Sequence, residues 1–229
     1  MVVCSTVGSG KGVRDNAGDA GYAGARLLVV AGGEGAGGGA VADAMIETFR
    51  TCGIGVASGE DVGTGLDAAI TAVRARLQHL KEGSPVLSDT YASFAAMAWS
   101  GRDIAVANLG DAAAFLLRDG ELFQITEDNL FHGCVINPWW HPTSLRTLDD
   151  KREVDIEVLR RTAQMCDCYL LCTGGLLTAV PAETMWEVLT SVQDRAWAVQ
   201  RLLDLAKQRG GPSSITCMIA DVIPGPQRP

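Results

Sequence analysis

The chain has 229 residues and a formal net charge of −8, and its sequence pI is about 4.9. This length predicts one domain, which we place at residues 1–223, and a short tail at 224–229. The acidic balance and the lack of a basic patch argue against a nucleic-acid partner. No apolar run reaches the roughly 20 residues of a membrane span, and Met1 leads directly into a strand-like run instead of a signal peptide. We therefore predict a cytoplasmic protein without a membrane partner, whose seven cysteines are reduced.

The N-terminal part is organised around one apolar run. We expect an edge strand at 2–6 and a Gly- and Asp-rich loop at 7–25. The run RLLVVA at 26–31 is bounded by breakers and is typical of a strand buried on both faces. Gly32 and Gly33 follow it. A strand, a glycine turn and a helix in this order often bring the backbone close to a phosphate or a metal ion, although the same glycines are also typical of a flexible connector.

Periodicity and turn residues predict the remaining elements. The predicted helices lie at 39–52, 65–80, 181–192 and 195–209, and the further strands lie at 90–99, 104–109, 113–118, 122–125, 169–172 and 215–222. Ser100-Gly101 and Asp119-Gly120 are hairpin signals, so the central strands predict an antiparallel meander. The segment 154–162 fits either a short strand or a helix. This order of elements predicts two sheets covered by helices.

Two N-terminal blocks resemble the opening of the type 2C, metal-dependent serine/threonine protein phosphatases, the PPM family. That family begins with Arg-x-x-Asn-Glu/Gln-Asp and continues with a strand that ends in Val-Ala-Asp-Gly-Met-Gly-Gly. Arg14 and Asp19 stand at the spacing of the first block, and residues 30–36 align with the second. Gly32, however, stands where the family has an aspartate that bridges its metal ions.

Four further blocks follow in the family's order and spacing. They lie at 109–120 (Val-Gly-Asp-Ser-Arg in the family), 125–129 (Leu-Thr-x-Asp-His), 170–176 (Leu-Leu-Cys-Ser-Asp-Gly-Leu) and 213–216 (Asp-Asn-Ile-Thr). Because chance rarely supplies order as well as composition, the chain is identified as a degenerate member of this family. The resemblance implies an α+β fold, a four-layer αββα sandwich of two antiparallel sheets flanked by helix pairs.

The resemblance also implies a site for two Mg²⁺ or Mn²⁺ ions, held by aspartates from four blocks and by one backbone carbonyl. The matching positions are Asp19, Gly32, Gly174 and Ser213, with Gly33 supplying the carbonyl. Hard divalent cations need several anionic oxygens to offset the loss of their hydration, and one carboxylate remains here. We therefore expect no cofactor, with Asp19 as the only side chain left to touch a metal.

Other polar residues near these blocks have two readings each. Asp15, Glu34 and Asp111 are candidate replacement ligands, or else they are solvated loop acids. Arg14 matches the family's phosphate-binding arginine, and an arginine can clamp a phosphate without a metal. The alternative for Arg14 is a surface arginine that pairs with the acids beside it.

The loop around Trp139 and Trp140 falls where the family has a variable flap beside the active site. Two adjacent tryptophans on a loop do not easily both point inward, so one of them is a candidate anchor for a partner. Alternatively, both cap the edge of the sandwich. His132, Cys134 and His141 share this loop, but their spacing is not that of a structural zinc site.

These patterns predict a catalytically inactive pseudophosphatase, from a bacterial source by its Ala- and Gly-rich composition. In this reading it is a regulatory or scaffolding module that recognises a protein partner, such as a phosphoprotein or a kinase, through the former active-site cleft. The alternative is an enzyme: a weak or rebuilt metal-dependent serine/threonine phosphatase, or a cleft turned to small-molecule chemistry.

Overall fold

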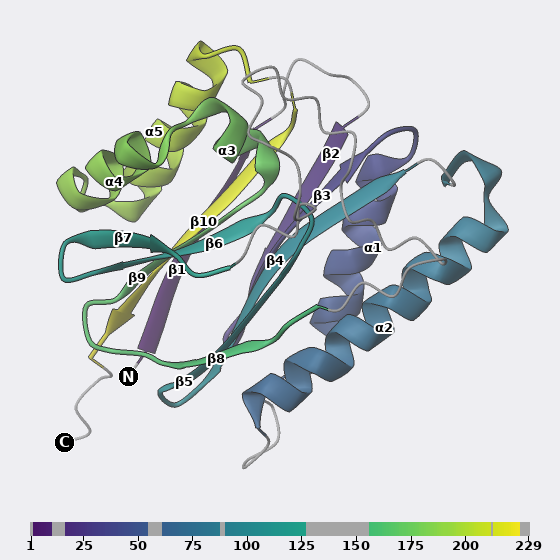
Figure 1. The fold of residues 1–229 in the computed structure, drawn as a ribbon, viewed down its shortest axis with the longest axis horizontal. Coiled ribbons are helices and arrows are strands. Elements are labelled where there is room, and N and C mark those ends of the chain that lie inside the picture. Colours follow the sequence, from purple (N-terminus) through teal and green to yellow (C-terminus); the bar gives the residue numbers. More distant parts are fainter. Residues whose placement is uncertain are drawn as a thin grey trace, which may run out of the picture.

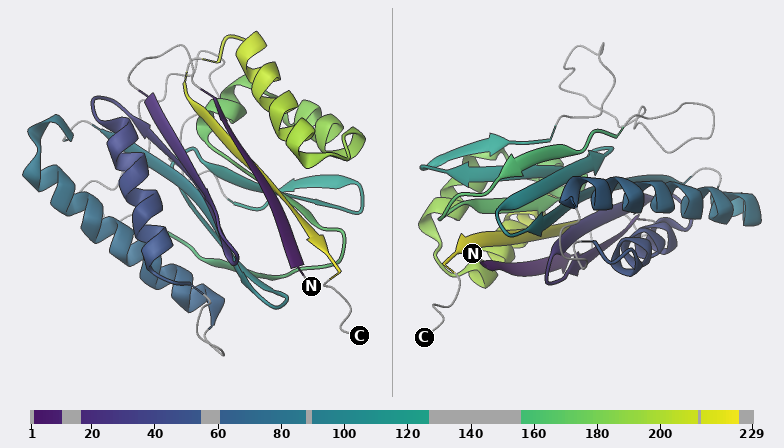
Figure 2. Two further views of the ribbon diagram at one scale, coloured as in Figure 1. Left: turned by 180° about the vertical axis from the view of Figure 1, so that it is seen from behind. Right: turned by 90° about the horizontal axis from the view of Figure 1, so that it is seen from below.

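Two antiparallel sheets of five strands each lie face to face, and helices cover the outer face of each sheet (Figure 1). The computed structural model describes residues 2–10, 17–54, 61–87, 90–126, 156–211 and 213–224. The layers separate clearly when the molecule is seen from behind and from below (Figure 2). The predicted α+β, four-layer αββα sandwich is therefore confirmed.

Sheet A joins strands that are distant in the sequence, whereas four of the five strands of sheet B follow one another in chain order. Sheet A has the order β1-β10-β9-β6-β7, built from β1 (Val2–Gly10), β10 (Ile215–Ile223), β9 (Cys168–Cys172), β6 (Ala113–Arg118) and β7 (Glu121–Gln124). Sheet B has the order β2-β3-β4-β5-β8, built from β2 (Ala17–Ala23), β3 (Leu27–Glu34), β4 (Tyr91–Ser100), β5 (Asp103–Leu109) and β8 (Leu159–Thr162). Both chain ends thus contribute to sheet A, since β1 pairs with β10.

The helices divide between the two outer layers. Against sheet B pack α1 (Gly38–Thr51) and α2 (Val62–Gly83), which leads into the short 3-10 turn η1 (Pro85–Leu87). Against sheet A pack α3 (Gly174–Ala179), α4 (Ala182–Ser191) and α5 (Arg195–Gln208). Asp194 caps α5 by accepting hydrogen bonds from the backbone N–H groups of Ala196 and Trp197, which explains why this helix begins where it does.

Three apolar cores follow from the two-residue period of the strands. Along β3, Leu28 and Val30 face sheet A, whereas Val29 and Ala31 face the helices α1 and α2. A third core lies between sheet A and helices α3 to α5. Because both faces of β3 are buried, its sequence is a continuous apolar run, as we predicted for residues 26–31.

Two local predictions near the N-terminus are wrong. The loop predicted at 7–25 is in its described part mostly strand: β1 continues to Gly10, and β2 occupies Ala17–Ala23. The sequence of β2, AGDAGYA, has no β-branched residue, and its extended form follows from pairing with β3. For the same reason Gly32 and Gly33 lie inside β3 and not in a turn after it.

The predicted central meander is also wrong at its midpoint. The β4–β5 and β6–β7 hairpins are present, but β5 and β6 belong to different sheets. The chain crosses from one sheet to the other at Gly110, whose φ of +71° is a conformation that favours glycine. This crossing places the next residue, Asp111, between the two sheets' ends, where a hairpin would not have placed it.

Glycines let helix α1 lie close to sheet B. A Cβ built on Gly33 overlaps the Gly38 carbonyl, and one built on Gly18 overlaps the backbone of Gly39. Both contacts are with backbone atoms, which cannot move aside as a flexible side chain would. Gly18 and Gly33 are opposite each other in the β2–β3 register, so one close approach fixes both positions.

The Gly33→Ala variant tests this close approach. We expect it to lose about 2 kcal/mol of unfolding free energy, because the added methyl group forces α1 away from the sheet. Chemical denaturation measures the loss. Gly83→Ala is the matched control, since a Cβ there meets nothing within 4 Å and the φ is not positive; an equal loss in both variants would contradict the account.

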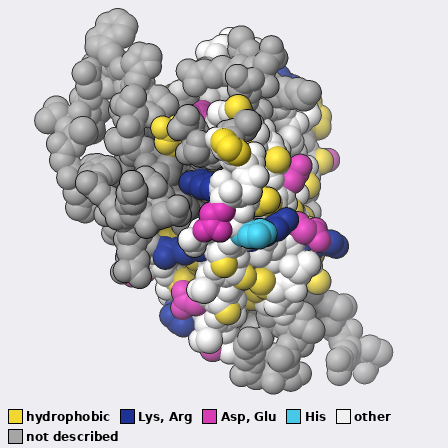
Figure 3. All heavy atoms as spheres, turned by 90° about the vertical axis from the view of Figure 1, so that its right-hand side faces the viewer, with side chains coloured by type: hydrophobic (Ala, Val, Ile, Leu, Met, Phe, Trp, Pro, Cys, Tyr) yellow, Lys and Arg dark blue, Asp and Glu magenta, His cyan; other side chains and the backbone are white. Residues whose placement is uncertain are grey.

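Basic and acidic side chains are interspersed on the face that α2 covers (Figure 3).

Among the described helices, none is both long enough and apolar enough to cross a membrane. The cytoplasmic location remains a prediction.

Candidate functional site

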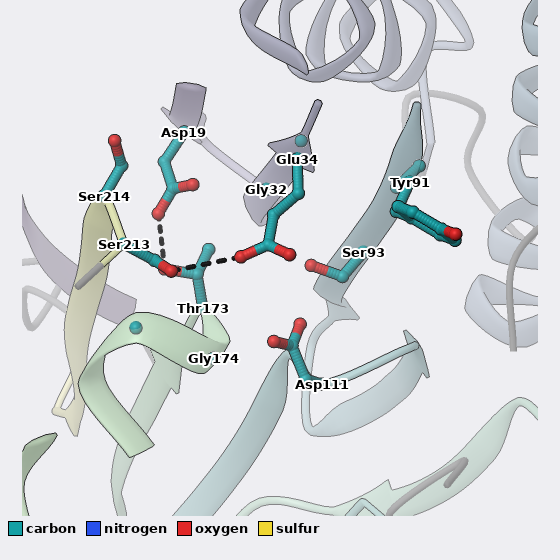
Figure 4. Close-up of a pocket in the computed structure, with 13 residues that line it drawn as sticks. Asp19, Gly32, Glu34, Tyr91, Ser93, Asp111, Thr173, Gly174, Ser213 and Ser214 are labelled. Carbon is teal, nitrogen blue, oxygen red and sulfur yellow. Dashed lines mark hydrogen bonds between the residues drawn. The ribbon is translucent and has the colours of Figure 1, made fainter. Parts of the chain in front are cut away.

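A small pocket opens where strands of the two sheets end on the same side of the sandwich (Figure 4). It draws residues from both sheets and from the start of α3. The lining residues are Asp19, Gly32, Gly33, Glu34, Tyr91, Ala92, Ser93, Asp111, Thr173, Gly174, Gly175, Ser213 and Ser214. Three of these described residues are acidic and none is basic, so the pocket has a negative charge that no neighbouring cation in its lining offsets.

Strand register gives the sheet B half of the pocket. Gly32 lies opposite Asp19 on one side and opposite Ser93 on the other, and directly opposite residues project to the same face. That face is the one turned toward sheet A, since Val30 two residues earlier packs in the core between the sheets. Gly32 itself leaves the space open: a Cβ there would lie 2.9 Å from Ser93 Oγ and 3.3 Å from Asp19 Oδ1.

Two hydrogen bonds join the sheet B acids to residues that adjoin strands β9 and β10 of sheet A. Thr173 Oγ1 donates to Asp19 Oδ2 over 2.6 Å, and Ser213 Oγ donates to Glu34 Oε1 over 3.0 Å. Thr173 is also the acceptor for the Thr216 backbone N–H at 3.0 Å, which fixes the orientation of its hydroxyl. The acids are therefore held by side-chain hydroxyl groups across the gap between the sheets.

Asp111 reaches the pocket from the crossing between β5 and β6. Its carboxylate points toward the start of α3, whereas the Tyr91 ring turns away from the three acids (Figure 4). A Cβ built on Gly174 would overlap the Asp111 carboxylate. The Asp111 side chain therefore occupies the space into which any side chain at position 174 would project.

Burial raises the pKa of Asp19 from 3.8 to about 6. The hydrogen bond from Thr173 opposes this shift, and the negative charges of Asp111 and Glu34 add to it. Asp19 is therefore ionised at neutral pH, but its ionisation requires more free energy in the folded state than in the unfolded chain. The cavity has a volume of about 20 Å³, which is room for roughly one water molecule.

The structure brings most of the predicted site residues together. Asp19, Gly32, Gly33, Gly174 and Ser213 all line the pocket, and so do two of the proposed replacement acids, Glu34 and Asp111. The remaining predicted residues, Arg14, Asp15, Trp139 and Trp140, lie outside the described residues, as do His132, Cys134 and His141.

Sequence reasoning missed four polar residues of the pocket, namely Tyr91, Ser93, Thr173 and Ser214. Thr173 follows β9 directly and precedes Gly174, so its place beside a site position was a usable signal. Ser93 interrupts an otherwise apolar strand on the face that packs between the sheets. Tyr91 carried no signal, because its position at the pocket depends on the register of β4 with β3.

Comparison with known proteins gives the same family as the blocks. The chain is 34% identical over 222 residues to the serine/threonine protein phosphatase PstP of Mycobacterium tuberculosis, a match that covers 92% of this chain and 43% of PstP. It is 26% identical over 173 residues to the serine/threonine phosphatase stp of Listeria monocytogenes, covering 71% of this chain and 69% of that protein. No family model matches the chain.

Solved structures agree over nearly the whole chain. The catalytic domain of PstP in complex with two manganese ions has a TM-score of 0.88 and 34% identity, covering 97% of this chain and 99% of that one. The PPM Ser-Thr phosphatase MsPP of Mycobacterium smegmatis, in complex with cacodylate, has a TM-score of 0.82 and 25% identity, covering 96% and 99%. The chain belongs to the PPM family of metal-dependent serine/threonine phosphatases. It spans less than half the length of PstP, the first of its curated relatives.

The expectation that no cofactor is involved is wrong. It was inferred from the missing aspartates alone, and the structure of PstP contains two manganese ions in a domain that this chain matches almost end to end. Divalent metal ions are therefore the cofactor of the relatives, and Mn²⁺ belongs in every assay of this chain.

The residues present do not fit a two-ion centre of the kind that the resemblance implies. Of the four aspartate positions only Asp19 carries a carboxylate, and Asp111 occupies the space beside Gly174. Among the described residues, no group of three or more His, Cys, Asp or Glu side chains is arranged to hold a metal ion. The chemistry of this pocket is therefore that of three carboxylates and the hydroxyl groups bonded to two of them.

The Asp19→Asn variant tests the electrostatic cost of the pocket. The folded state binds a proton at Asp19 more tightly than the unfolded chain does, so this residue lowers stability as pH rises from about 4 to above 6. An amide keeps the acceptor for Thr173 and removes the charge. We expect a gain of about 3 kcal/mol at pH 7.5 that falls to about 1 kcal/mol at pH 4.5, measured by urea denaturation in chelator.

The matched control is Asp43→Asn, because Asp43 is an exposed residue of α1. We expect its effect to be small and nearly independent of pH. A gain for Asp19→Asn that is the same at both pH values, or a loss at pH 7.5, would show that the Asp19 carboxylate is not destabilised by its burial.

Proposed function

We propose that this chain is a pseudophosphatase, a member of the PPM family that binds a partner protein and does not hydrolyse phosphoesters. The observation that carries the proposal is that Gly32, Gly174 and Ser213, three positions where the family has aspartates, line the pocket without a carboxylate. The Asp111 carboxylate lies against Gly174 in this pocket. Together with the hydroxyl contacts of Asp19 and Glu34, it leaves a cavity of about 20 Å³.

The chemistry of the family explains why this change matters. According to the resemblance, a water molecule between two metal ions attacks phosphorus, and the ions offset the charge that develops on the phosphoryl oxygens. In this chain Ser213 and Thr173 each donate a hydrogen bond to a carboxylate oxygen of the pocket. Three of the four positions where the family has aspartates carry no carboxylate. The charge that remains suits a hydrogen-bonded pocket more than a pair of divalent ions.

The partner in this proposal is a protein, such as a phosphoprotein or a kinase. The relatives are serine/threonine phosphatases, and the proposal takes its class of partner from them. Arg14, Trp139 and Trp140 are the residues that we assign to this contact, on the sequence grounds given above. Replacing both tryptophans by Ala should then abolish partner capture without a large change in stability.

A second candidate function is a phosphatase with a rebuilt site. The observation in its favour is that Asp19, Glu34 and Asp111 line one pocket, so the acids proposed as replacements do reach it. Two observations argue against it: the cavity is small, and Asp19 and Glu34 already accept hydrogen bonds from Thr173 and Ser213.

The variant with Asp at positions 32, 174 and 213 tests the proposed function. Without metal the added carboxylates crowd Asp19 and Asp111, so we expect a lower melting temperature in chelator than that of the parent chain. Mn²⁺ should then raise the melting temperature of the variant more than that of the parent. Hydrolysis of p-nitrophenyl phosphate in Mn²⁺ should rise on the order of a hundredfold or more above the parent.

The matched control carries Asn at the same three positions, which reproduces the size of Asp without its charge. It should gain neither the response to Mn²⁺ nor turnover. A folded Asp variant that gains no response to Mn²⁺ would contradict the view that these three positions account for the difference from the active relatives.

A further inference from the structure

A groove on the outer face of the molecule lies between helices α4 and α5, in the layer that covers sheet A (Figure 1). It has a volume of about 370 Å³. From α4 it is lined by Thr184, Glu187, Val188 and Ser191, with Val192 just after that helix. From α5 it is lined by Trp197, Arg201 and Leu205, with Arg209 just after that helix. None of these residues lines the acidic pocket, so the groove is a separate feature of the surface.

The floor of the groove is apolar and its wall is an exposed tryptophan. Val188 is buried, and Val192 and Leu205 are half-buried between the helices. Trp197 is 64% exposed, the largest exposed fraction among the large apolar side chains of the described residues. Trp186 on α4 donates its indole N–H to the Gly120 carbonyl, whereas the Trp197 indole makes no hydrogen bond with the described part of the chain. An exposed tryptophan beside an apolar floor is typical of a binding anchor.

The charges of the groove differ in sign from those of the whole chain. Two arginines, Arg201 and Arg209, line it against one acid, Glu187, although the chain carries a net charge of −8. Arg209 donates a hydrogen bond to the Ala179 carbonyl and forms no ion pair with the described residues. Arg201 has neither a hydrogen bond nor an ion pair within the described ranges. The guanidinium groups are thus available for an anionic ligand at a place where an acidic ligand is not repelled.

We propose that the α4–α5 groove binds a short acidic segment of a partner protein, with one apolar side chain on the floor and carboxylates at the arginines. Helix α4 has 10 residues and is therefore about 15 Å long. An extended segment rises about 3.3 Å per residue, so roughly five residues span the groove. The apolar side chain packs against Leu205 and Trp197, and acidic residues on either side of it pair with Arg201 and Arg209.

This inference goes beyond the proposed function, because it rests on the helical layer and not on the pocket between the sheets. The groove is present whether or not the pocket hydrolyses phosphoesters. If the groove binds no peptide, the pseudophosphatase proposal still stands. If the pocket hydrolyses phosphoesters, the proposal for the groove still stands.

The test uses fluorescein-labelled peptides of the form Glu-Asp-X-Glu-Asp, in which X is Leu, Ile, Phe or Trp, with Gln-Asn-X-Gln-Asn as the uncharged match. Fluorescence anisotropy with the whole chain should show binding of at least one acidic peptide. The uncharged match should bind at least about tenfold more weakly, and added salt should weaken the acidic peptide. Absence of binding by all four acidic peptides, or equal binding of both sets, would overturn the proposal.

Variants place the binding at the groove. Arg201→Glu and Trp197→Ala should each weaken the acidic peptide at least about tenfold, since one loses the charge pair and the other the anchor. Lys207→Glu is the matched control, because Lys207 lies on the same helix outside the groove and undergoes the same charge reversal. Equal weakening by Arg201→Glu and Lys207→Glu would show attraction to the general charge of α5 and would overturn the assignment.

A second copy of this chain is the competing occupant. Sedimentation velocity of the parent chain and of Trp197→Ala distinguishes it from a peptide ligand. We expect both to sediment as monomers. A parent dimer that dissociates in the Trp197→Ala variant would assign the groove to self-association and would overturn the proposal.

Discussion

Partly buried carboxylates that lie close together repel one another, and the pocket between the two sheets is arranged under that constraint. Asp19, Glu34 and Asp111 line one cavity, and the pKa of Asp19 is raised to about 6 by burial and by the other two charges. Two hydroxyl groups from the opposite sheet, those of Thr173 and Ser213, bond to two of the acids. In relatives such as PstP, two manganese ions are present in the structure. Positions 32, 174 and 213 of this chain carry no carboxylate, and hydroxyl groups bond to two of the three acids that line the pocket.

The packing of the fold depends on other residues than most of those that line the pocket. The three apolar cores lie between the layers, and Ala92 is the one described pocket residue that belongs to them. The chain has a TM-score of 0.88 to the catalytic domain of PstP over 97% of its length. The close approach of Gly18 and Gly33 to α1 belongs to the scaffold, because it fixes where β2 and β3 end relative to the helix.

Much of the architecture could be predicted from the sequence, because β3 contains a continuous apolar run and the long helices have apolar residues at helical spacing. The family blocks also located Asp19, Gly32, Gly174 and Ser213, which do meet in one pocket. Strand β2 was missed because its small residues take their conformation from pairing with β3. The meander was mispredicted because the hairpin signals do not say which sheet the next hairpin joins, and the crossing at Gly110 decides where Asp111 lies. Contacts such as that of Asp111 with Gly174 join residues 63 positions apart (174 − 111), and local sequence patterns do not predict such contacts.

The measurement that tests the account most directly is hydrolysis of p-nitrophenyl phosphate by the pure chain in excess Mn²⁺, beside the same chain in chelator. The catalytic domain of PstP, assayed in parallel, shows that the conditions support the family's chemistry. The account predicts that the rate for this chain in Mn²⁺ equals its rate in chelator. Turnover that depends on Mn²⁺ and is abolished by Asp111→Asn would contradict it, and would make the three acids of the pocket a working site.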